Sequence, residues 1–242
     1  MTDAEKHKLE QRILKRFHKA LSAYSLIEDN DKVLVALSGG KDSLCLLELL
    51  ARRMRIQRPL FKVEAIHIRM ENIHYETDTA YLQNFCSGLG VPLHIVTTRF
   101  DAYAGTKKPA CFLCSWYRRK EIFNKAQELG CNKIALGHHL DDIVQTALMN
   151  VFSQGHFSTM PARLTMRKMP LTIIRPLCLE TEADIQALAE IRQYEKQLKT
   201  CPYDKASSRA DIKLMLAEAE KINPDAKYSI MNALDAEGKL VE

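Results

Sequence analysis

The stretch Val33-Leu34-Val35-Ala36-Leu37-Ser38-Gly39-Gly40-Lys41-Asp42-Ser43 decides the fold of this chain. An apolar run typical of a buried strand ends directly in two glycines, and leucines at helical spacing begin at Leu44. Glycines at such a junction let backbone N–H groups close around an anion, and the N-terminus of the next helix adds partial positive charge. The serines add hydroxyls, and Lys41 adds a point charge suited to phosphate.

The segment is not a Walker A loop, in which four residues separate the first glycine from Gly-Lys-Ser/Thr. We therefore expect a phosphate-binding corner between a strand and a helix. The alternative is an ordinary corner with glycine at the turn.

From residue 32 onward, expected strands and helices alternate. The patterns predict strands at 32–37, 61–69, 92–98, 132–137 and 171–177, and helices at about 42–55, 77–89, 115–129 and 141–153. Such alternation implies an α/β fold with a parallel five-stranded sheet and helices on both faces. Ligands of such folds bind at the carboxyl ends of the strands, where the glycine loop and Gly137 both lie.

Helical segments flank this α/β region. Apolar residues at helical spacing predict an amphipathic helix over residues 3–27. We interpret its basic face as solvated; the alternative is that these cations face the phosphates of an RNA. Beyond residue 178 the pattern predicts helices at about 181–198 and 211–221. We therefore divide the chain into an N-terminal helix (1–28), a nucleotide-binding α/β domain (29–180) and a helical extension (181–242).

The composition is typical of a soluble globular protein. The 242 residues are 46% hydrophobic and 27% charged, and no apolar run approaches the roughly 18 residues of a membrane helix. The N-terminus lacks the apolar region of a signal peptide, so we expect a cytoplasmic protein with no membrane partner. A net charge of +5 permits nucleic-acid binding without requiring it.

Two adjacent carboxylates, Asp141 and Asp142, follow Gly137-His138-His139-Leu140 at the expected start of a helix. Carboxylates at a sheet edge can hold Mg²⁺ against phosphates, although acidic residues at a helix N-terminus also stabilise the helix dipole. The presence of the phosphate loop favours the magnesium interpretation. We assign catalytic roles to Lys41, Asp42 and Asp141.

Cys111 and Cys114 stand in an expected loop just before a helix. Two thiolates at this spacing can bind one metal, form a redox disulfide or hold part of an iron–sulfur cluster. A tetrahedral zinc site would need a second matching pair, which the sequence lacks. Cys201 is a third loop cysteine, and three cysteines would hold three irons of a cubane cluster and leave the fourth open.

Seven cysteines at uneven spacing argue against a disulfide framework. We interpret the remaining four as buried apolar side chains: Cys45, Cys86, Cys131 and Cys178.

Basic residues beside aromatic ones follow the cysteine pair, and a second basic stretch lies near residue 165. Trp116 and Tyr117 precede the first group. Aromatic faces suit unstacked bases and cations suit phosphates, although surface solvation explains each stretch separately. The candidate RNA contacts are Arg118, Arg119, Lys120, Arg163 and Arg167.

These motifs together resemble those of the PP-loop ATPases, and within them the tRNA 2-thiocytidine synthetases. The resemblance rests on Ser38–Ser43, which matches SGGxDS, on Cys111-x-x-Cys114 and on Gly137-His138-x-x-Asp141-Asp142. It continues in Ile27-Glu28-Asp29, Met160-Pro161 and Ile174-Arg175-Pro176-Leu177, and it covers roughly residues 10–205. The family commonly carries a second Cys-x-x-Cys, whereas here Pro202-Tyr203-Asp204 follows Cys201.

The resemblance implies a HUP-type, Rossmann-like domain that uses ATP with Mg²⁺ and releases AMP and pyrophosphate. It implies that Cys111, Cys114 and Cys201 hold a [4Fe–4S] cluster and that the substrate is a cytidine in the anticodon loop of tRNA. A sulfur donor such as a cysteine desulfurase is an implied partner, and a homodimer is one assembly that we consider. The implied ATP site comprises Ser38, Gly39, Gly40, Lys41, Asp42, Ser43, His67 and Gly137.

Three functions follow from the sequence. The first is an ATP-dependent sulfurtransferase that adenylates the C2 oxygen of a tRNA cytidine and replaces it with sulfur. The second keeps the adenylation but thiolates or amidates another nucleoside or a small molecule, and salt-dependent binding would separate it from the first. The third is a non-catalytic nucleotide- or RNA-binding module with structural zinc, which metal analysis would identify.

Overall fold

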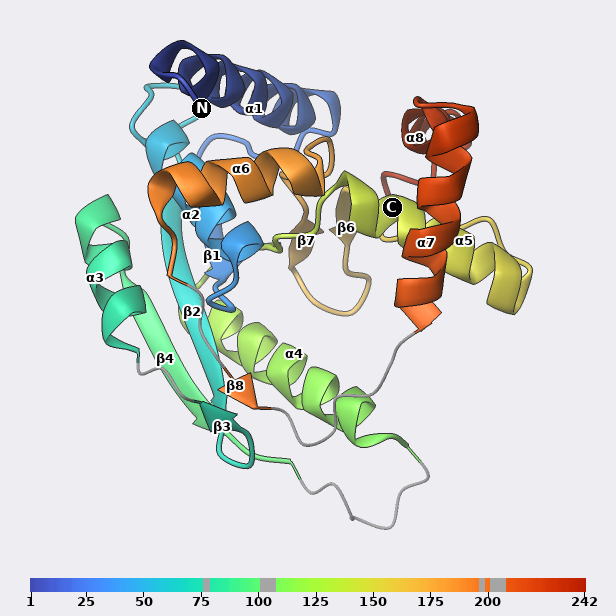
Figure 1. Ribbon diagram of the computed structural model, residues 1–242. Helices are drawn as coiled ribbons and strands as arrows, with labels where there is room; N and C mark the ends of the chain where they lie inside the picture. The colour runs from blue at the N-terminus through green and yellow to red at the C-terminus, as the bar shows by residue number, and fades with distance from the viewer. Residues whose placement is uncertain (76–78, 101–107, 196–198, 201–207) are drawn as a thin grey trace. The chain divides into compact units, whose positions relative to one another are not determined.

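The computed structural model describes residues 1–75, 79–100, 108–195, 199–200 and 208–242 (Figure 1). The chain forms two compact units, each assembled from separated segments. The first unit comprises Met1–Ile27, Leu136–Arg192 and Ala206–Glu242, and the second comprises Glu28–Ala135 and Gln193–Lys205. The three linear domains expected from the sequence stay a prediction.

A parallel sheet forms the centre of the second unit. Its strands are β1 (Lys32–Ala36), β2 (Lys62–Met70), β4 (Leu93–Thr98) and β5 (Lys133–Ala135), in the order β4-β2-β1-β5. Val33 of β1 pairs with Val63 on one side and with Lys133 on the other. Val33, Leu34 and Val35 are all buried. Because successive side chains of a strand point to opposite faces, both faces of this sheet are covered.

Three helices pack around that sheet. α2 (Lys41–Met54) packs against β1 and β2, and α4 (Ala110–Glu128) packs against β2 and β4 (Figure 1). α3 (Ala80–Leu89) packs against α2 and β4. A short antiparallel pair, β3 (His74–Tyr75) and β8 (Lys199–Thr200), also belongs to this unit. The parallel sheet with alternating helices confirms the predicted α/β fold class.

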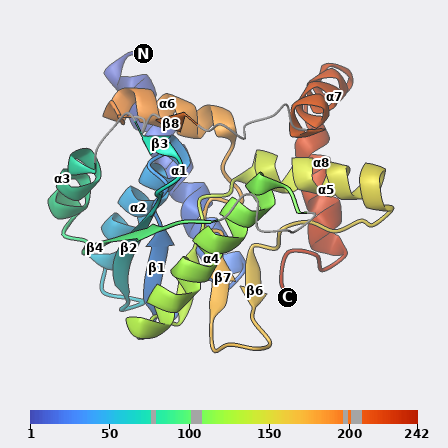
Figure 2. The same ribbon diagram turned by 90° about the horizontal axis from the view of Figure 1, so that it is seen from below.

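Helices make up most of the first unit. α1 (Asp3–Ala23) packs against α6 (Glu182–Arg192) through an apolar stripe that includes Ile13 and Phe17. α5 (Leu140–Gln154) packs against α7 (Ser208–Ile222) and α8 (Ala226–Ala236), which also pack against each other (Figure 2). In the ranges that the structure describes, none of the helices has both the length and the apolar character that a membrane span needs.

The last expected strand differs from its prediction. A strand does form inside the expected range 171–177, but β7 (Thr172–Ile174) is shorter than expected, and it pairs antiparallel with β6 (Arg163–Thr165). The sequence predicted no strand at β6. The connection between β6 and β7 is too short for a crossover, which explains why they form an antiparallel hairpin. Leaving aside β3 and β8, the described chain has six strands where five were expected.

Several helix boundaries also differ from their predictions. α4 begins at Ala110 instead of near residue 115, so Cys111 and Cys114 lie in a helix and not in the expected loop. Pro109 immediately precedes the helix. At this position its fixed φ is compatible with the start of a helix, and its missing N–H removes no helical hydrogen bond. α6 ends at Arg192 because Gln193 turns to a φ of 54°. α8 was not predicted.

Candidate active site

The glycine loop connects β1 to α2 in the second unit. Gly39 has a φ of 84°, a left-handed conformation that favours glycine, and Gly40 is the N-cap residue of α2. The Gly40 carbonyl accepts the N–H groups of Ser43 and Leu44 at 3.1 Å each. The first turn of a helix leaves backbone N–H groups without helical acceptors, and this geometry suits an anion.

The side chains of the loop brace it. The Ser43 hydroxyl donates to the Gly40 carbonyl at 2.9 Å, and the Ser38 hydroxyl donates to Ser43 Oγ at 3.1 Å. The Gly40 N–H donates to Ser38 Oγ at 3.3 Å. Lys41 Nζ lies 3.1 Å from Asp42 Oδ1, so the acid that follows the two glycines is paired with the lysine beside it.

His67, an interior residue of β2, lies beside this loop. Its Nδ1 is 2.7 Å from the carbonyl oxygen of Leu37, the last residue before Ser38. Because a carbonyl only accepts, Nδ1 carries the proton. His67 therefore links two neighbouring strands where the loop begins, and its role in nucleotide binding stays a prediction.

A small cavity of about 70 Å³ connects the loop with α4. Ser38 and Arg118 supply its polar groups, and Ile122 supplies part of its apolar wall. The other lining residues come from β1, β2 and the start of the loop: Ala36, Leu37, Ile66 and Ile68.

The cysteine pair lies on the same side of α4 as this cavity. Cys111, Cys114 and Arg118 are spaced i, i+3 and i+7, which places them on one helix face. Arg118 lines the cavity with Ser38, so this face is turned toward the phosphate loop. Cys111 is exposed and Cys114 is half-buried. The third predicted ligand, Cys201, lies outside the described residues.

Cys111 and Cys114 supply two candidate ligands for a metal or cluster. Across the described ranges no three His, Cys, Asp or Glu side chains gather in a way that could hold a metal ion.

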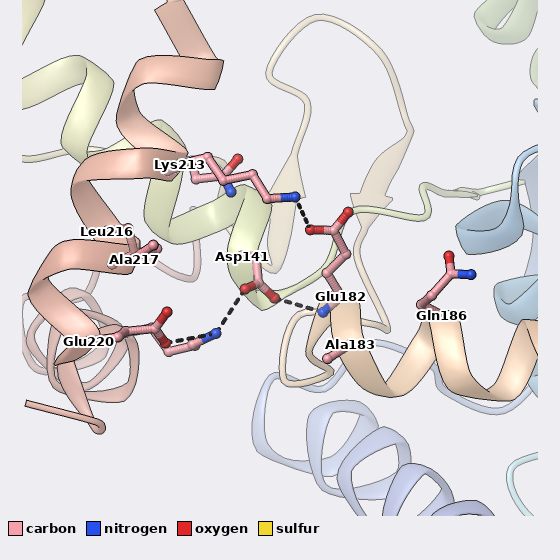
Figure 3. Close-up of a pocket in the computed structure, with 10 residues that line it drawn as sticks. Asp141, Glu182, Ala183, Gln186, Lys213, Leu216, Ala217 and Glu220 are labelled. Atoms are coloured by element: carbon pink, nitrogen blue, oxygen red, sulfur yellow. Dashed lines mark hydrogen bonds and ion pairs between the residues drawn. The ribbon is translucent and has the colours of Figure 1, made fainter.

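The acidic motif lies in the first unit, at the start of α5. Asp141 is buried beside a cavity of about 320 Å³, shown in Figure 3. Its Oδ2 accepts the backbone N–H of Glu182 at 2.7 Å, and its Oδ1 lies 3.0 Å from Lys227 Nζ. Burial alone would raise the pKa of Asp141, but the Glu182 N–H and the Lys227 ammonium hold it below its ordinary value. Asp141 therefore anchors the first turn of α6 and the helix α8.

Asp142 is bound in a similar way. Its Oδ1 accepts from Arg209 at 3.0 Å, and its Oδ2 accepts the His139 N–H at 3.2 Å. A magnesium ion at Asp141 or Asp142 would compete with positive side chains for the same oxygens. This arrangement does not fit the ion as it stands, and we assign no step to it; the magnesium site stays a prediction.

The histidine of the same motif meets a distant arginine. Arg175 Nε donates to His138 Nδ1 at 3.2 Å, and the same guanidinium donates to the carbonyl of Pro161. Burial, and next the charge of Arg175, lowers the pKa of His138 to about 4. His138 is therefore neutral near pH 7 and accepts a hydrogen bond. Gly137 adjoins it, in the segment between β5 and α5.

Comparison with known proteins identifies the family. A family model described as a PP-loop domain matches residues 6–215. The tRNA-cytidine(32) 2-sulfurtransferases of Bordetella avium and Burkholderia multivorans are 36% and 37% identical over 237 and 238 residues. Each alignment covers 95% of this chain, with 74% and 70% of the two relatives. The chain belongs to this PP-loop family of tRNA-cytidine 2-sulfurtransferases.

A solved structure agrees. The U34-tRNA thiolase of Methanococcus maripaludis, determined with its [4Fe–4S] cluster, matches with a TM-score of 0.78 and 27% sequence identity. The match covers 98% of this chain and 81% of that one.

In this member of the PP-loop family, the predicted RNA contacts are divided between the two units. Arg119 and Lys120 are exposed on α4, whereas Arg118 points into the cavity with Ser38. Arg167 is exposed between β6 and β7. Arg163 is half-buried in β6, where its backbone pairs with Leu240 and Glu242. The role of these residues in RNA binding stays a prediction.

Sequence reasoning missed the cations that bind the acidic motif. Lys227 and Arg209 lie on α8 and α7, far along the chain from Asp141 and Asp142. No local pattern in this PP-loop protein links those positions. A buried carboxylate requires a partner, so burial of the two aspartates was the one signal that could have predicted such cations.

Proposed function

We propose that the protein catalyses the ATP-dependent thiolation of a cytidine in the anticodon loop of tRNA, giving 2-thiocytidine. One observation carries the proposal: the face of α4 with Cys111, Cys114 and Arg118 is turned to the cavity that Ser38 also lines. Two candidate thiolate ligands and the glycine loop thus lie on the same side of one unit, which supports the proposal. The similarity to tRNA-cytidine(32) 2-sulfurtransferases supports tRNA as the substrate.

The phosphate loop would bind ATP. The first-turn N–H groups of α2 and the ammonium of Lys41 would hold the phosphates. The C2 oxygen of cytosine would attack the α-phosphorus, and pyrophosphate would leave. Preorganised donors around the leaving group stabilise the charge that develops on it, which is usually a large part of catalysis.

Adenylation would make the C2 oxygen part of a good leaving group. A sulfur nucleophile then adds to C2, and the C2–O bond breaks to release AMP. The new C2–S bond leaves sulfur where oxygen was. Arg118, which lines the cavity together with Ser38, would stabilise negative charge on the departing phosphate.

The cysteine face fits the cluster that the family implies. Cys111 and Cys114 are one turn apart at the N-terminal end of α4, where the helix dipole favours negatively charged thiolates. Cys201 is proposed as the third ligand. When bound, a [4Fe–4S] cluster would supply an iron with an open position for the sulfur atom.

The partners are also proposals. A cysteine desulfurase or another sulfur donor would supply the sulfur, and a cytoplasmic location and a homodimer stay predictions. The likeness to a U34-tRNA thiolase makes a uridine the second candidate base.

Mass spectrometry of tRNA nucleosides tests the proposal and separates the two bases. In a strain that lacks the gene, 2-thiocytidine should disappear while 2-thiouridine derivatives stay at their parental level. The wild-type gene should restore it, and so should Cys131→Ala, because Cys131 is a buried cysteine beyond the C-terminal end of α4, whereas Cys111 lies in its first turn. Cys111→Ala should not restore it. Unchanged 2-thiocytidine in the deletion strain, or full restoration by Cys111→Ala, would overturn the assignment.

A further inference from the structure

One face of α4 exposes aromatic rings. Phe112 and Trp116 are one helical turn apart and are 41% and 47% exposed. The ring of Trp116 also meets that of Tyr117 edge-on, with centroids 5.0 Å apart. Large aromatic side chains exposed next to one another typically mark an interaction site.

Cations surround these rings. Lys108 Nζ lies 4.7 Å from the centroid of Phe112, and Lys120 Nζ lies 5.7 Å from that of Trp116. Arg119 is exposed, and its Nε donates to the Ser115 carbonyl at 3.2 Å, which holds the guanidinium along the helix. At 100° per residue, positions 112, 116, 119 and 120 fall within one arc of about 100°. The acidic residues of α4, which is described in full, fall outside that arc: Glu121 and Glu128.

We infer that this arc of α4 is a stacking surface for the unpaired nucleotides that flank the target base of the RNA. Aromatic rings bind bases of any sequence by stacking, and neighbouring cations bind the phosphates of the same strand. Lysines are depleted at protein–protein interfaces, whereas here Lys108 and Lys120 lie over the rings and every charged group of the arc is positive. The inference rests on the proposed function, because that function supplies the RNA.

The position of the arc fits such a role. Trp116 and Arg118 are about 200° apart on the helix, so the stacking surface lies opposite the face with Cys111 and Cys114. An α-helix is about 10 Å across with its side chains. A loop of RNA can therefore rest neighbouring nucleotides on the outer face of α4 while one base reaches the cysteine face.

Trp116 is the single tryptophan of the chain, so its fluorescence reports on this surface alone. We would titrate the cluster-containing protein with an anticodon stem-loop RNA and with a fully paired RNA of equal phosphate number. The stem-loop should quench the emission, because a stacked base contacts the indole. The duplex should bind through its charge but quench little. The cluster absorbs light equally in both titrations, so its absorbance cancels when the quenching by the two RNAs is compared.

Two variants give a second measurement, made by anisotropy of labelled stem-loop RNA. Trp116→Ala should weaken binding about tenfold, while Trp116→Phe, which keeps a ring, should weaken it less than about threefold. ATP binding should stay unchanged in both. The same two variants should bind the duplex as the wild type does.

The outcomes separate this inference from the proposed function. If the wild type forms 2-thiocytidine but the stem-loop leaves Trp116 emission unchanged, or quenches it no more than the duplex does, the stacking surface is refuted and the function stands. If quenching and the Trp116→Ala loss are found without any 2-thiocytidine, the surface stands and the function fails.

Discussion

Lys227 Nζ lies 3.0 Å from Oδ1 of Asp141, and this pair joins α8 to the first turn of α5. Both side chains are largely buried, with 17% and 11% of their surface exposed. Burial alone would lower the pKa of Lys227, but hydrogen bonds to Glu220 and Asp141 raise it. This charge pair therefore adds a buried polar contact to the packing of α5 against α8.

Lys227→Ala should lower the free energy of unfolding by about 3 kcal/mol, because it leaves the carboxylate of Asp141 buried without its cation. The control is Lys221→Ala, which removes a lysine paired with Glu218 at the surface, where the two side chains are 71% and 70% exposed. That control should cost less than about 0.5 kcal/mol. Urea unfolding followed by circular dichroism measures the stability of both variants. Equal losses of unfolding free energy in the two variants would contradict the stabilising role of the Lys227–Asp141 pair.

The two glycines of the phosphate loop should respond differently to alanine. Gly39 has a φ of 84°, so Gly39→Ala should cost about 1–2 kcal/mol in strain and weaken ATP binding. At Gly40 an added Cβ would meet Ser38 Oγ at 3.5 Å, an ordinary contact, and φ is −85°. Gly40→Ala should therefore cost only the penalty of alanine at an N-cap, less than about 1 kcal/mol. Urea unfolding and calorimetric ATP titration of both variants test this prediction. If Gly40→Ala were less stable than Gly39→Ala, the conformational requirement for glycine would lie at Gly40 and not at Gly39.

The carboxyl group of Glu180 should make stability fall as the pH rises. The residue is fully buried, and burial raises its pKa to about 8, against the opposing effect of Arg16, whose Nη1 is 3.9 Å away. Between its ordinary value near 4.5 and about 8, the folded state holds a proton that the unfolded state has released. Stability should therefore fall by about 1.4 kcal/mol per pH unit in this range.

Glu180→Gln removes this titration. From pH 5.5 to pH 7.5 the wild type should lose about 2–3 kcal/mol more than the variant does. Urea unfolding of both proteins at the two pH values gives the comparison. Parallel pH dependences would show that Glu180 does not stay protonated in the folded protein.

Loss of either cysteine on α4 should empty the cluster site without harming the phosphate loop. Cys111→Ala and Cys114→Ala, purified without oxygen, should contain less than about a tenth of the wild-type iron and acid-labile sulfide, because two protein ligands hold a cubane poorly. ATP binding should be retained, since the loop residues lie between β1 and α2. Cys86→Ala is the control, as Cys86 is buried in α3. Wild-type iron content in Cys111→Ala, or zinc in its place in the wild type, would exclude the proposed ligand set.

The sequence was sufficient for the parts of the site that are local. The run Val33–Leu37, the glycines and the leucines of α2 follow one another directly, so burial of the strand and the left-handed Gly39 fix the corner without help from distant residues. The parallel sheet followed for a similar reason, since alternating strand and helix patterns allow few other arrangements. The i, i+3 spacing of Cys111 and Cys114 was also readable, although the helix that carries them was expected to begin later.

Features that join distant segments required the tertiary structure. The sequence could not show that Arg175 meets His138, that Lys227 and Arg209 bind the acidic motif, or that β6 pairs with β7. Nor could it show which face of α4 turns toward Ser38. Local order along a chain determines backbone conformation and periodicity, whereas the partner of a buried charge is set by packing between elements, because only the folded chain brings those charges within reach of each other.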